Sequence, residues 1–336
     1  MRSNENLRTA KKTKNDEFYT QYADIEEEVI NYKDKLKGKS IYCNCDSPSS
    51  EFVRYFTTNF QTLGIKSITA TGYNKGGNGT YYFYDGQKTV NSSLTGEGSF
   101  DSQECLDILK NSDIIITNPP FSLFREFMNW IWKGPGLQFL VIGNMNAITY
   151  KEIFPKIKNN LMWSGAKPWS NFEFETPELD DKGNKVKKSV PAIWFTNIDH
   201  GRKHQPLQLM TVAENLRFSK HKSIKGKTFE EAYPKYENYN AINVDFTDAI
   251  PKDYDGVMGV PISFLDKYCP DQFEIVGCAD ADITPVGWKG ATKDFVDLYY
   301  AQGNTGSYKE GNRLAHYVSS AGDAKVPYKR ILIRKK

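Results

Sequence analysis

The sequence predicts an α/β protein with a doubly wound, mostly parallel sheet, an antiparallel hairpin and a separate C-terminal region. Short apolar runs alternate with amphipathic helical segments up to residue 144, a pattern typical of parallel strands joined by crossover helices. Two strand-like stretches joined by a turn-rich link then follow, and beyond residue 200 the chain becomes polar and irregular. These three observations define the fold class, and we place a domain boundary near residue 200.

The predicted helices are segments whose apolar residues recur at three- and four-residue spacing. The first begins after a polar turn and carries Ile25, Val29 and Ile30 on one side. The second stops at Gly64, and glycine is the residue type that most often ends a helix. The predicted helices cover residues 16–36, 50–64, 102–112 and 122–132.

The predicted strands are short apolar runs bounded by turn residues. A hairpin with a glycine-rich turn is expected at residues 74–90 as an insertion. Residues 169–176 and 186–198 are expected to form a second hairpin that is added antiparallel to the parallel sheet. The predicted strands of the parallel sheet are 40–45, 65–73, 113–117 and 137–144, and later apolar stretches lie at 257–268, 273–278 and 328–334.

Length and composition limit the class of protein. A chain of 336 residues is longer than one compact core usually holds, so we expect two domains or one elaborated domain. Its 39% apolar and 25% charged residues are typical of soluble globular proteins. It lacks both a run of eighteen apolar residues and the apolar core of a secretory signal. We therefore expect a cytoplasmic protein, with no membrane partner, whose five cysteines are reduced thiols.

Positive charge is concentrated in two short segments although the net charge is only +3. Such clusters indicate local contact with a polyanion, although a solvated tail and a solvated loop would have the same composition. The first segment, residues 1–14, contains Arg2, Arg8, Lys11, Lys12 and Lys14 against Glu5 alone. The second, residues 201–227, contains Arg202, Lys203, Arg217, Lys220, Lys222, Lys225 and Lys227 against Glu214 alone.

The corner at Asn118-Pro119-Pro120-Phe121 is the most informative feature of the chain. It follows an apolar strand, so in a doubly wound sheet it faces the edge where ligands bind. The Asn118 amide oxygen and the Pro119 carbonyl oxygen are acceptors, and two consecutive prolines hold the backbone rigid. A Pro-Pro turn that merely ends a strand is the simpler interpretation.

A pair of fixed acceptors suits the exocyclic amino group of a nucleobase. Acceptors placed off the ring plane favour a pyramidal nitrogen and direct its lone pair outward. Phe121 can stack on the face of a planar base, and a rigid corner holds the amine for an in-line displacement. The corner therefore predicts chemistry on an aromatic amine.

Several blocks of the sequence together resemble the EcoRI-type adenine-specific DNA methyltransferase family. This resemblance implies a Rossmann-like methyltransferase sheet in which Asn118, Pro119, Pro120 and Phe121 form the catalytic motif. It also implies transfer of a methyl group from S-adenosylmethionine to the 6-amino nitrogen of adenine in double-stranded DNA, and functional pairing with a restriction endonuclease. The blocks are residues 14–26, 42–48, 112–127, 141–155, 194–200 and 253–277.

The resemblance also implies positions for the cofactor. Phe18, Tyr19 and Thr20 lie where related enzymes contact the cofactor carboxylate, with an aromatic pair packed under the sheet as the alternative. In the glycine-free loop after the first strand, Asn44, Asp46 and Pro48 are candidates for the methionine end and the ribose. Asp46 is equally suited to be a helix N-cap.

The adenine of the cofactor is expected near residues 100 and 101. By resemblance, Phe100 would cover the adenine ring and Asp101 would accept a hydrogen bond from its amine, although an aspartate in a loop is more often a helix cap. The second strand is not followed by an acid for the ribose hydroxyls. No Cys-x-x-Cys or His-x-x-x-His pair is present, so we expect no metal.

We interpret residues 1–200 as a cofactor-binding catalytic domain and residues 201–336 as a DNA target-recognition region. An adenine must leave the duplex to reach Asn118, so we expect base flipping. Alternative functions are methylation of cytosine N4, RNA adenine or a protein glutamine, or DNA binding without catalysis. The candidate phosphate contacts are Arg202, Lys203, Lys220, Lys222, Lys225 and Lys227.

Overall fold

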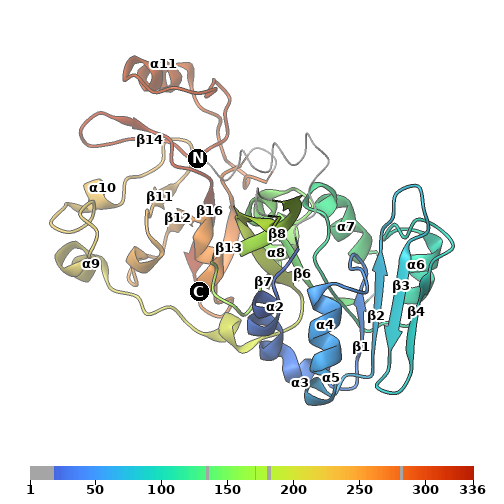
Figure 1. Ribbon diagram of the computed structural model, residues 1–336. Helices are drawn as coiled ribbons and strands as arrows, with labels where there is room; N and C mark the ends of the chain where they lie inside the picture. The colour runs from blue at the N-terminus through green and yellow to red at the C-terminus, as the bar shows by residue number, and fades with distance from the viewer. Residues whose placement is uncertain (1–18, 134–135, 171, 180–182, 281–282) are drawn as a thin grey trace. The chain divides into compact units, whose positions relative to one another are not determined.

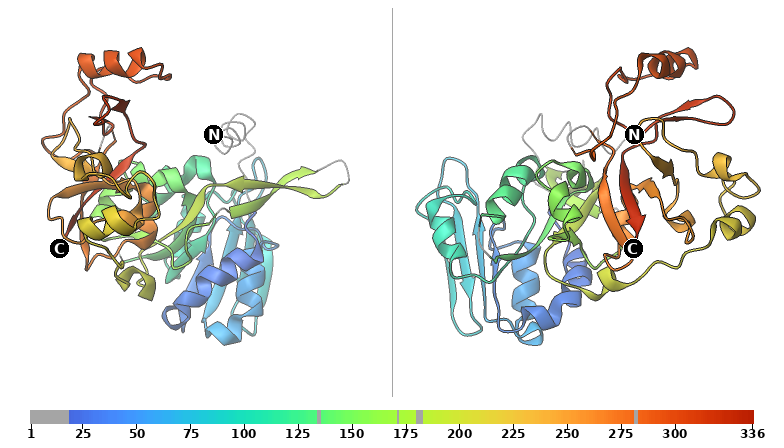
Figure 2. Two further views of the ribbon diagram at one scale, coloured as in Figure 1. Left: turned by 90° about the vertical axis from the view of Figure 1, so that its left-hand side faces the viewer. Right: turned by 180° about the vertical axis from the view of Figure 1, so that it is seen from behind.

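A computed structural model of the protein describes residues 19–133, 136–170, 172–179, 183–280 and 283–336. Packing within the chain divides it into two compact units. The first consists of Met1–Ile153 with Leu161–His200, and the second of Phe154–Asn160 with Gly201–Lys336. Each unit is built around a sheet of its own (Figures 1 and 2).

The first unit contains an eight-stranded sheet in the order β4-β3-β2-β1-β5-β6-β10-β7. Strands β2, β1, β5 and β6 are parallel, whereas β3, β4, β10 and β7 pair antiparallel with their neighbours. The predicted mostly parallel, doubly wound sheet is therefore confirmed. Its strands are β1 (Ser40–Cys43), β2 (Ser67–Gly72), β3 (Thr80–Tyr84), β4 (Thr89–Ser93), β5 (Ile114–Thr117), β6 (Gln138–Asn144), β7 (Trp163–Ser164) and β10 (Ala192–Thr196).

All four predicted helical segments form in the first unit. Gly64 ends the second of them with φ of 62°, a left-handed conformation that glycine adopts without strain. No helix in the described part of the chain is long and apolar enough to cross a membrane. The helices and 3₁₀ turns are α2 (Tyr22–Val29), η1 (Ile30–Tyr32), α3 (Lys33–Leu36), α4 (Glu51–Thr58), α5 (Phe60–Leu63), α6 (Gln103–Leu109), η2 (Phe121–Leu123), α7 (Phe124–Ile131) and η3 (Met145–Thr149).

The buried face of the first helical segment differs from the prediction at one residue. Ile25 and Val29 are fully buried, but Ile30 is 49% exposed. The helix tightens into the 3₁₀ turn η1 at Ile30, which rotates the following side chains, so that Tyr32 and Leu36 enter the core instead. These residues, with those of α4, cover one face of the large sheet (Figure 1).

The second predicted hairpin is wrong in its connection to the sheet. Strands β8 (Phe172–Leu179) and β9 (Lys185–Val190) form a separate two-stranded ribbon, which extends away from the large sheet in Figure 2. Only β10 joins the large sheet, antiparallel to β6. Pro191 lies between β9 and β10 and separates them, because it has no N–H group to donate to a strand ladder. Its carbonyl accepts a hydrogen bond of 2.8 Å from the N–H of Met145.

The earlier hairpin, expected at residues 74–90, is the antiparallel pair β3–β4. Its tight turn lies at residues 85–88, where the Asp85 carboxylate accepts hydrogen bonds from the N–H groups of Gln87 and Lys88. The glycine-rich residues 76–79 lie in the turn between the antiparallel strands β2 and β3, one strand before the turn that joins β3 to β4. The hairpin extends the large sheet at its β2 edge.

The second unit is built on a four-stranded mixed sheet in the order β11-β12-β16-β13. Buried Arg330 donates hydrogen bonds to Asn243 and Asp245, which joins β16 to the segment around β11. The sequence pattern did not indicate β11, α9 or α11, nor that residues 154–160 would pack with this unit. Its elements are α8 (Phe154–Lys158), η4 (Gly201–His204), α9 (Val212–Phe218), α10 (Phe229–Ala232), β11 (Ala241–Asn243), η5 (Thr247–Ala249), β12 (Val257–Pro261), η6 (Ile262–Lys267), β13 (Phe273–Cys278), α11 (Lys293–Ala301), β14 (Tyr317–Val318), β15 (Ala324–Lys325) and β16 (Arg330–Lys335).

A buried carboxylate, Glu28, fixes α2 against the loop that follows β7. One of its oxygens accepts hydrogen bonds from the Tyr32 hydroxyl at 2.6 Å and the Ala166 N–H at 2.7 Å. The other oxygen accepts from the Lys167 N–H at 2.7 Å. A fully buried carboxylate is tolerated only when donors satisfy it in this way.

Replacing Glu28 should destabilise the first unit strongly. Glu28→Ala removes the acceptor of the Lys167 N–H and of the Tyr32 hydroxyl, whereas the Ala166 N–H keeps a hydrogen bond of 3.1 Å to the Tyr32 hydroxyl. Each buried unsatisfied group costs about 1–3 kcal/mol. We expect the free energy of unfolding, measured with urea, to fall by about 3 kcal/mol. The matched control is Glu26→Ala on the exposed side of the same helix, which should stay within about 0.5 kcal/mol of wild type. Equal small effects of both variants would contradict this role of Glu28.

Candidate active site

The candidate site lies at the carboxyl edge of the large sheet, where the strand order reverses. Strand β1 has β2 on one side and β5 on the other, so the connection from β1 to β2 leads in one direction and the later connection from β4 to β5 leads back in the other. Ligands of doubly wound sheets bind outside the carboxyl ends of strands at such a reversal. Residues 44–48 follow β1 and residues 118–121 follow β5, so the structure brings both predicted segments to this edge.

The Asp46 carboxylate connects these two segments. It accepts a hydrogen bond of 2.6 Å from the Thr117 hydroxyl at the end of β5. It also accepts hydrogen bonds from the Ser50 side chain and from the backbone N–H of Asn118. Burial raises the pKa of Asp46 to about 7, and the hydrogen bonds oppose that rise. A buried acid of the loop after β1 therefore holds the backbone of the corner after β5.

The contacts at the start of α4 exclude one interpretation of Asp46. The N-cap of α4 is Ser50, whose side chain accepts a hydrogen bond of 3.3 Å from the Val53 N–H, so the interpretation of Asp46 as that cap is wrong. Asn44 is buried at the end of β1, and Pro48 lies half-buried in the turn that follows. The contacts of Asn44, Asp46 and Pro48 with a cofactor stay predictions.

The rigid corner combines buried and accessible parts. Pro119 is buried, and the side-chain oxygen of half-buried Asn118 is itself shielded from solvent. Phe121 packs edge-on against Phe174 of β8, with ring centroids 5.9 Å apart, and contacts the main core. Pro120 then begins a 3₁₀ turn, because its carbonyl accepts a hydrogen bond of 3.0 Å from the Leu123 N–H. The corner is anchored on both sides of Asn118.

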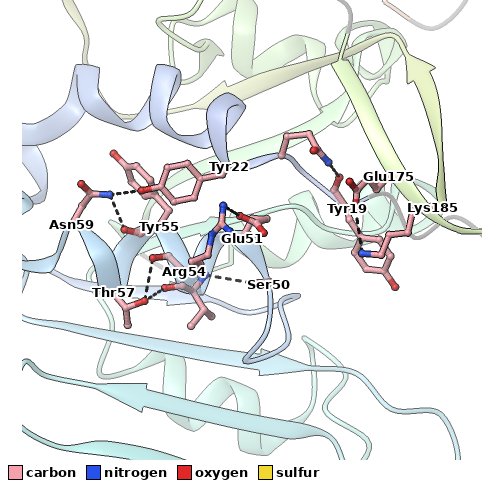
Figure 3. A network of polar contacts seen from close by, with 12 residues as sticks. Tyr19, Tyr22, Ser50, Glu51, Arg54, Tyr55, Thr57, Asn59, Glu175 and Lys185 are labelled. Atoms are coloured by element: carbon pink, nitrogen blue, oxygen red, sulfur yellow. Dashed lines mark hydrogen bonds and ion pairs between the residues drawn. The ribbon is translucent and has the colours of Figure 1, made fainter. Parts of the chain in front are cut away.

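The segment that precedes α2 is tied to the ribbon β8–β9. Tyr19 and Glu175 exchange backbone hydrogen bonds of 2.9 and 3.2 Å, and the Lys185 ammonium lies 5.0 Å from the Tyr19 ring centre (Figure 3). Tyr19 is 42% exposed, so the alternative of an aromatic pair under the sheet is wrong for this residue. Phe18 lies outside the described residues.

Two buried polar atoms of the candidate cofactor residues have no hydrogen-bond partner among the described residues. They are the Thr20 hydroxyl, next to the ribbon, and the side-chain nitrogen Nδ2 of Asn44, at the end of β1. Both residues are at least nine-tenths buried. Because leaving a buried polar group unpaired costs free energy, such atoms are typical of a site completed by a ligand.

Phe100 and Asp101 follow the hairpin β3–β4 and precede α6. Phe100 is packed edge-on between Phe127 and Trp130 of α7, with centroid distances of 5.2 and 5.7 Å. Asp101 is exposed and accepts a hydrogen bond from the Ser99 hydroxyl. The cap of α6 is Ser102, so the interpretation of Asp101 as that cap is wrong. Their roles toward the cofactor adenine stay predictions.

The sequence did not identify an acid at the end of β2, but the fold supplies one. The Glu97 carboxylate accepts hydrogen bonds from the Tyr73 hydroxyl at 2.9 Å and the Gly76 N–H at 2.8 Å. The hydrogen bond from the Gly76 N–H is the main reason that the pKa of Glu97 is lowered. Glu97 lies more than twenty residues after β2, and only the return of the hairpin β3–β4 brings it there.

The predicted phosphate contacts of the second unit differ in how freely they can bind. Arg202 forms an ion pair of 2.8 Å with Asp266, and Lys220 one of 2.8 Å with Asp248. Lys227 is 3.7 Å from Glu231, and Lys203 is half-buried. Lys222 and Lys225 are exposed and form no ion pair with any described residue. The basic cluster at residues 1–14 lies outside the described residues.

The thiols and acids do not gather into a metal site in the described part of the chain. No group of three or more histidine, cysteine, aspartate or glutamate side chains is arranged to hold an ion there. All five cysteines are free, and burial raises the pKa of the Cys43 and Cys45 thiols, which disfavours the thiolates that bind metals. That the protein needs no metal stays a prediction.

Comparisons with known proteins agree on one family. The model of a family described as "Adenine-specific methyltransferase EcoRI" matches residues 6–336. The chain is 43% identical to the type II methyltransferase M.EcoRI of Escherichia coli, over 82% of this chain and 89% of that protein. It is 39% identical to M.MpnI of Mycoplasma pneumoniae, over 80% and 84%. It is 37% identical to M.MgeORF184P of Mycoplasma genitalium, also over 80% and 84%.

The raised pKa of Asp46 predicts a specific pH dependence of stability. The folded carboxyl keeps its proton up to a pH of about 7, whereas the unfolded carboxyl loses it near pH 3.9. The stability contributed by Asp46 is therefore complete below about pH 4 and is lost as the pH rises to about 7. We expect the unfolding free energy of wild type, relative to that of Asp46→Asn, to fall between pH 5 and 7 and then become constant.

Asp85→Asn is the matched control for this measurement. Hydrogen bonds from the N–H groups of Lys88 and Gln87 lower the pKa of Asp85. Its stability contribution is therefore lost only as the pH falls below about 4. A urea titration series from pH 5 to 8 should show no trend for this variant relative to wild type. The same flat behaviour for Asp46→Asn would contradict the raised pKa.

Proposed function

The chain belongs to the EcoRI family of adenine-specific methyltransferases, and we propose that Asn118 to Phe121 hold the amino group of a flipped-out adenine for methylation by S-adenosylmethionine. The protein is a DNA adenine methyltransferase of the restriction–modification type. The resemblance noted in its sequence is thereby confirmed. The assignment of the cofactor, of base flipping and of individual residues is our proposal.

The observation that supports this proposal most directly is the hydrogen bond between Asp46 and the Asn118 backbone N–H. This bond fixes the backbone of Asn118, the residue that must orient the amine, and does not involve the Asn118 side chain. The Asn118 amide oxygen and the Pro119 carbonyl then accept the two N–H groups of the adenine amine. The nitrogen lone pair is directed away from these acceptors, toward the cofactor.

When bound, S-adenosylmethionine supplies a methyl group made electrophilic by the positive sulfur. It would supply this methyl group to the amine nitrogen as its carbon–sulfur bond breaks, and the nitrogen would release one proton to solvent. Asn118 and Pro119 orient the amine for this in-line displacement, and they stabilise the positive charge that develops on nitrogen. Phe121, fixed against Phe174, limits rotation of the base.

The residues at the carboxyl edge fit such a cofactor. The unpaired Nδ2 of Asn44 can donate to its carboxylate, and the unpaired Thr20 hydroxyl can donate to the same group. The Glu97 carboxylate at the end of β2 can accept from ribose hydroxyls, which supplies the acid that the sequence lacks after that strand. Phe100 and Asp101 retain their proposed positions at the cofactor adenine.

We propose that the second unit recognises the DNA target. Lys222 and Lys225 are its best candidates for phosphate contacts, because both are exposed and form no ion pair with any described residue. Arg202 is held by Asp266, so its proposed contact would require sharing the guanidinium between the carboxylate and a phosphate. A restriction endonuclease of the same specificity is the proposed functional partner.

Loss of the Asn118 amide should abolish methyl transfer and spare cofactor binding. Wild-type protein incubated with tritiated S-adenosylmethionine and duplex DNA should produce labelled N6-methyladenine after digestion to nucleosides. Asn118→Ala should lose at least about 100-fold in turnover, the effect of removing one stabilising group. Asn111→Ala, an exposed asparagine before β5, is the control and should keep full activity.

The labelled nucleoside also tests the rival activities. Labelled N4-methylcytosine, labelled RNA or labelled protein would assign the corner to a different amine. Absence of label in any product, with DNA binding retained, would indicate a binding protein without catalysis. Full turnover of Asn118→Ala would contradict the proposed mechanism.

The proposed phosphate contacts predict a change in the salt dependence of DNA binding. Each lysine that neutralises a phosphate contributes about 0.9 to the slope of log affinity against log salt. The double variant Lys222→Ala/Lys225→Ala should therefore reduce that slope by about 2, measured by fluorescence anisotropy from low to physiological salt. The control Lys35→Ala/Lys66→Ala removes two exposed lysines of the first unit and should leave the slope unchanged. Equal slopes for wild type and both double variants would exclude these contacts.

A further inference from the structure

Asn144, the last residue of β6, has one half of its side-chain amide satisfied and the other half unsatisfied. Its side-chain oxygen accepts a hydrogen bond of 2.9 Å from the Asn146 N–H and caps the 3₁₀ turn η3. Its side-chain nitrogen Nδ2 is shielded from solvent and has no hydrogen-bond partner among the described residues. The residue as a whole is only 7% exposed. Because the oxygen is fixed by a backbone donor, the nitrogen is fixed as an unpaired donor.

The strand pattern places this donor on the same face of the sheet as Asn118. Leu140 and Ile142 of β6 share a core cluster with Ile114 and Ile116 of β5. Alternate residues of a strand point to the same face, so Asn144 continues one row and Asn118 continues the other. Phe121 of the corner packs against the same cluster.

The register sets the separation of the two asparagines. Thr117 of β5 pairs with Val141 of β6, so continuing the register by one residue places Asn118 level with Ile142. Asn144 is two residues further along a neighbouring parallel strand. Their Cα atoms are therefore about 8 Å apart, from the usual spacing between strands and rise per residue. Two asparagine side chains can bracket one edge of a nucleobase across that distance.

Asn144 also lies on the side of Asn118 from which the base must approach. The switch point that suits the cofactor is between β1 and β5, whereas β6 flanks β5 on the opposite side. An in-line displacement requires the amine to enter opposite the sulfonium. The unpaired donor is thus placed next to the acceptor of the adenine amine and away from the cofactor.

We propose that Asn144 is a positioning residue that donates a hydrogen bond from Nδ2 to a ring nitrogen beside the amino group of the target adenine. The inference rests on the proposed function of Asn118. Adenine presents an amino donor flanked by two ring acceptors, N1 and N7. Asn118 accepts from the amine while Asn144 donates to one of these nitrogens. Together the two asparagines hold the base in its plane, so that the amine cannot rotate away from the methyl group.

The variant Asn144→Asp isolates the donor. A carboxylate keeps the oxygen that caps η3, and aspartate is a good N-cap, but it removes the N–H group. Turnover on duplex DNA should fall roughly 10- to 100-fold, the effect of one hydrogen bond in a buried site, with unchanged cofactor affinity and thermal unfolding. Asn91→Asp adds the same charge to an exposed strand of the same sheet and should behave as wild type. Full turnover of Asn144→Asp, or a loss confined to cofactor affinity, would overturn the proposal.

Substrate analogues test the contact without relying on a variant that folds. The methylated adenine is first mapped on plasmid DNA, and duplexes are then made with 1-deazaadenine or 7-deazaadenine at that position. One analogue should slow wild-type turnover by a similar factor and should slow Asn144→Asp no further. Two results would overturn the contact. One is a wild-type rate that neither analogue changes, and the other is an analogue that slows Asn144→Asp by the same factor as it slows wild type. If wild type does not methylate adenine at all, the proposed function itself fails, which is a different result.

Discussion

The site depends on one buried carboxylate that connects two strands. Asp46 follows β1, yet its hydrogen bonds reach the Thr117 hydroxyl and the Asn118 backbone N–H at the end of β5. These strands lie side by side at the reversal of strand order, and each is followed by a loop that leads into a helical segment. Without this acceptor the N–H of Asn118 would have to find another partner, and the rigid Pro-Pro corner would be attached only at its ends. Positioning of the corner therefore comes from a residue that is distant in sequence.

Buried polar groups of the first unit differ in how they are paired. Glu28 has every oxygen satisfied by donors of its own unit, so it serves only to fix α2. Asn44 and Asn144 are also buried, but the side-chain nitrogen of each, at the carboxyl edge, has no hydrogen-bond partner among the described residues. Both donors lie at the edge of the sheet where we propose that the cofactor and the base bind. A ligand that supplied acceptors to these nitrogens would offset the free energy cost of burying them.

In the second unit, some charged side chains are buried and stabilise the fold, whereas others are exposed, as contact with DNA requires. Arg330 is buried and bonded to Asn243 and Asp245, and so belongs to its core. Lys222 and Lys225 are exposed within a loop between two short helices. Net charge alone cannot express this difference, since a nearly neutral chain can still present a local basic surface. In the proposed function, duplex binding by this unit and catalysis by the first are separable.

The sequence by itself determined the sheet type, the main helices and the corner Asn118 to Phe121, because apolar periodicity and prolines act locally. It could not determine that Pro191 would detach the ribbon β8–β9, or that η1 would expose Ile30. Nor could it show that Asp46 would hold Asn118, that Glu97 would return to the end of β2, or that Asn144 would retain an unpaired donor. Those outcomes are contacts between residues far apart in the chain, and only tertiary packing decides which donor meets which acceptor.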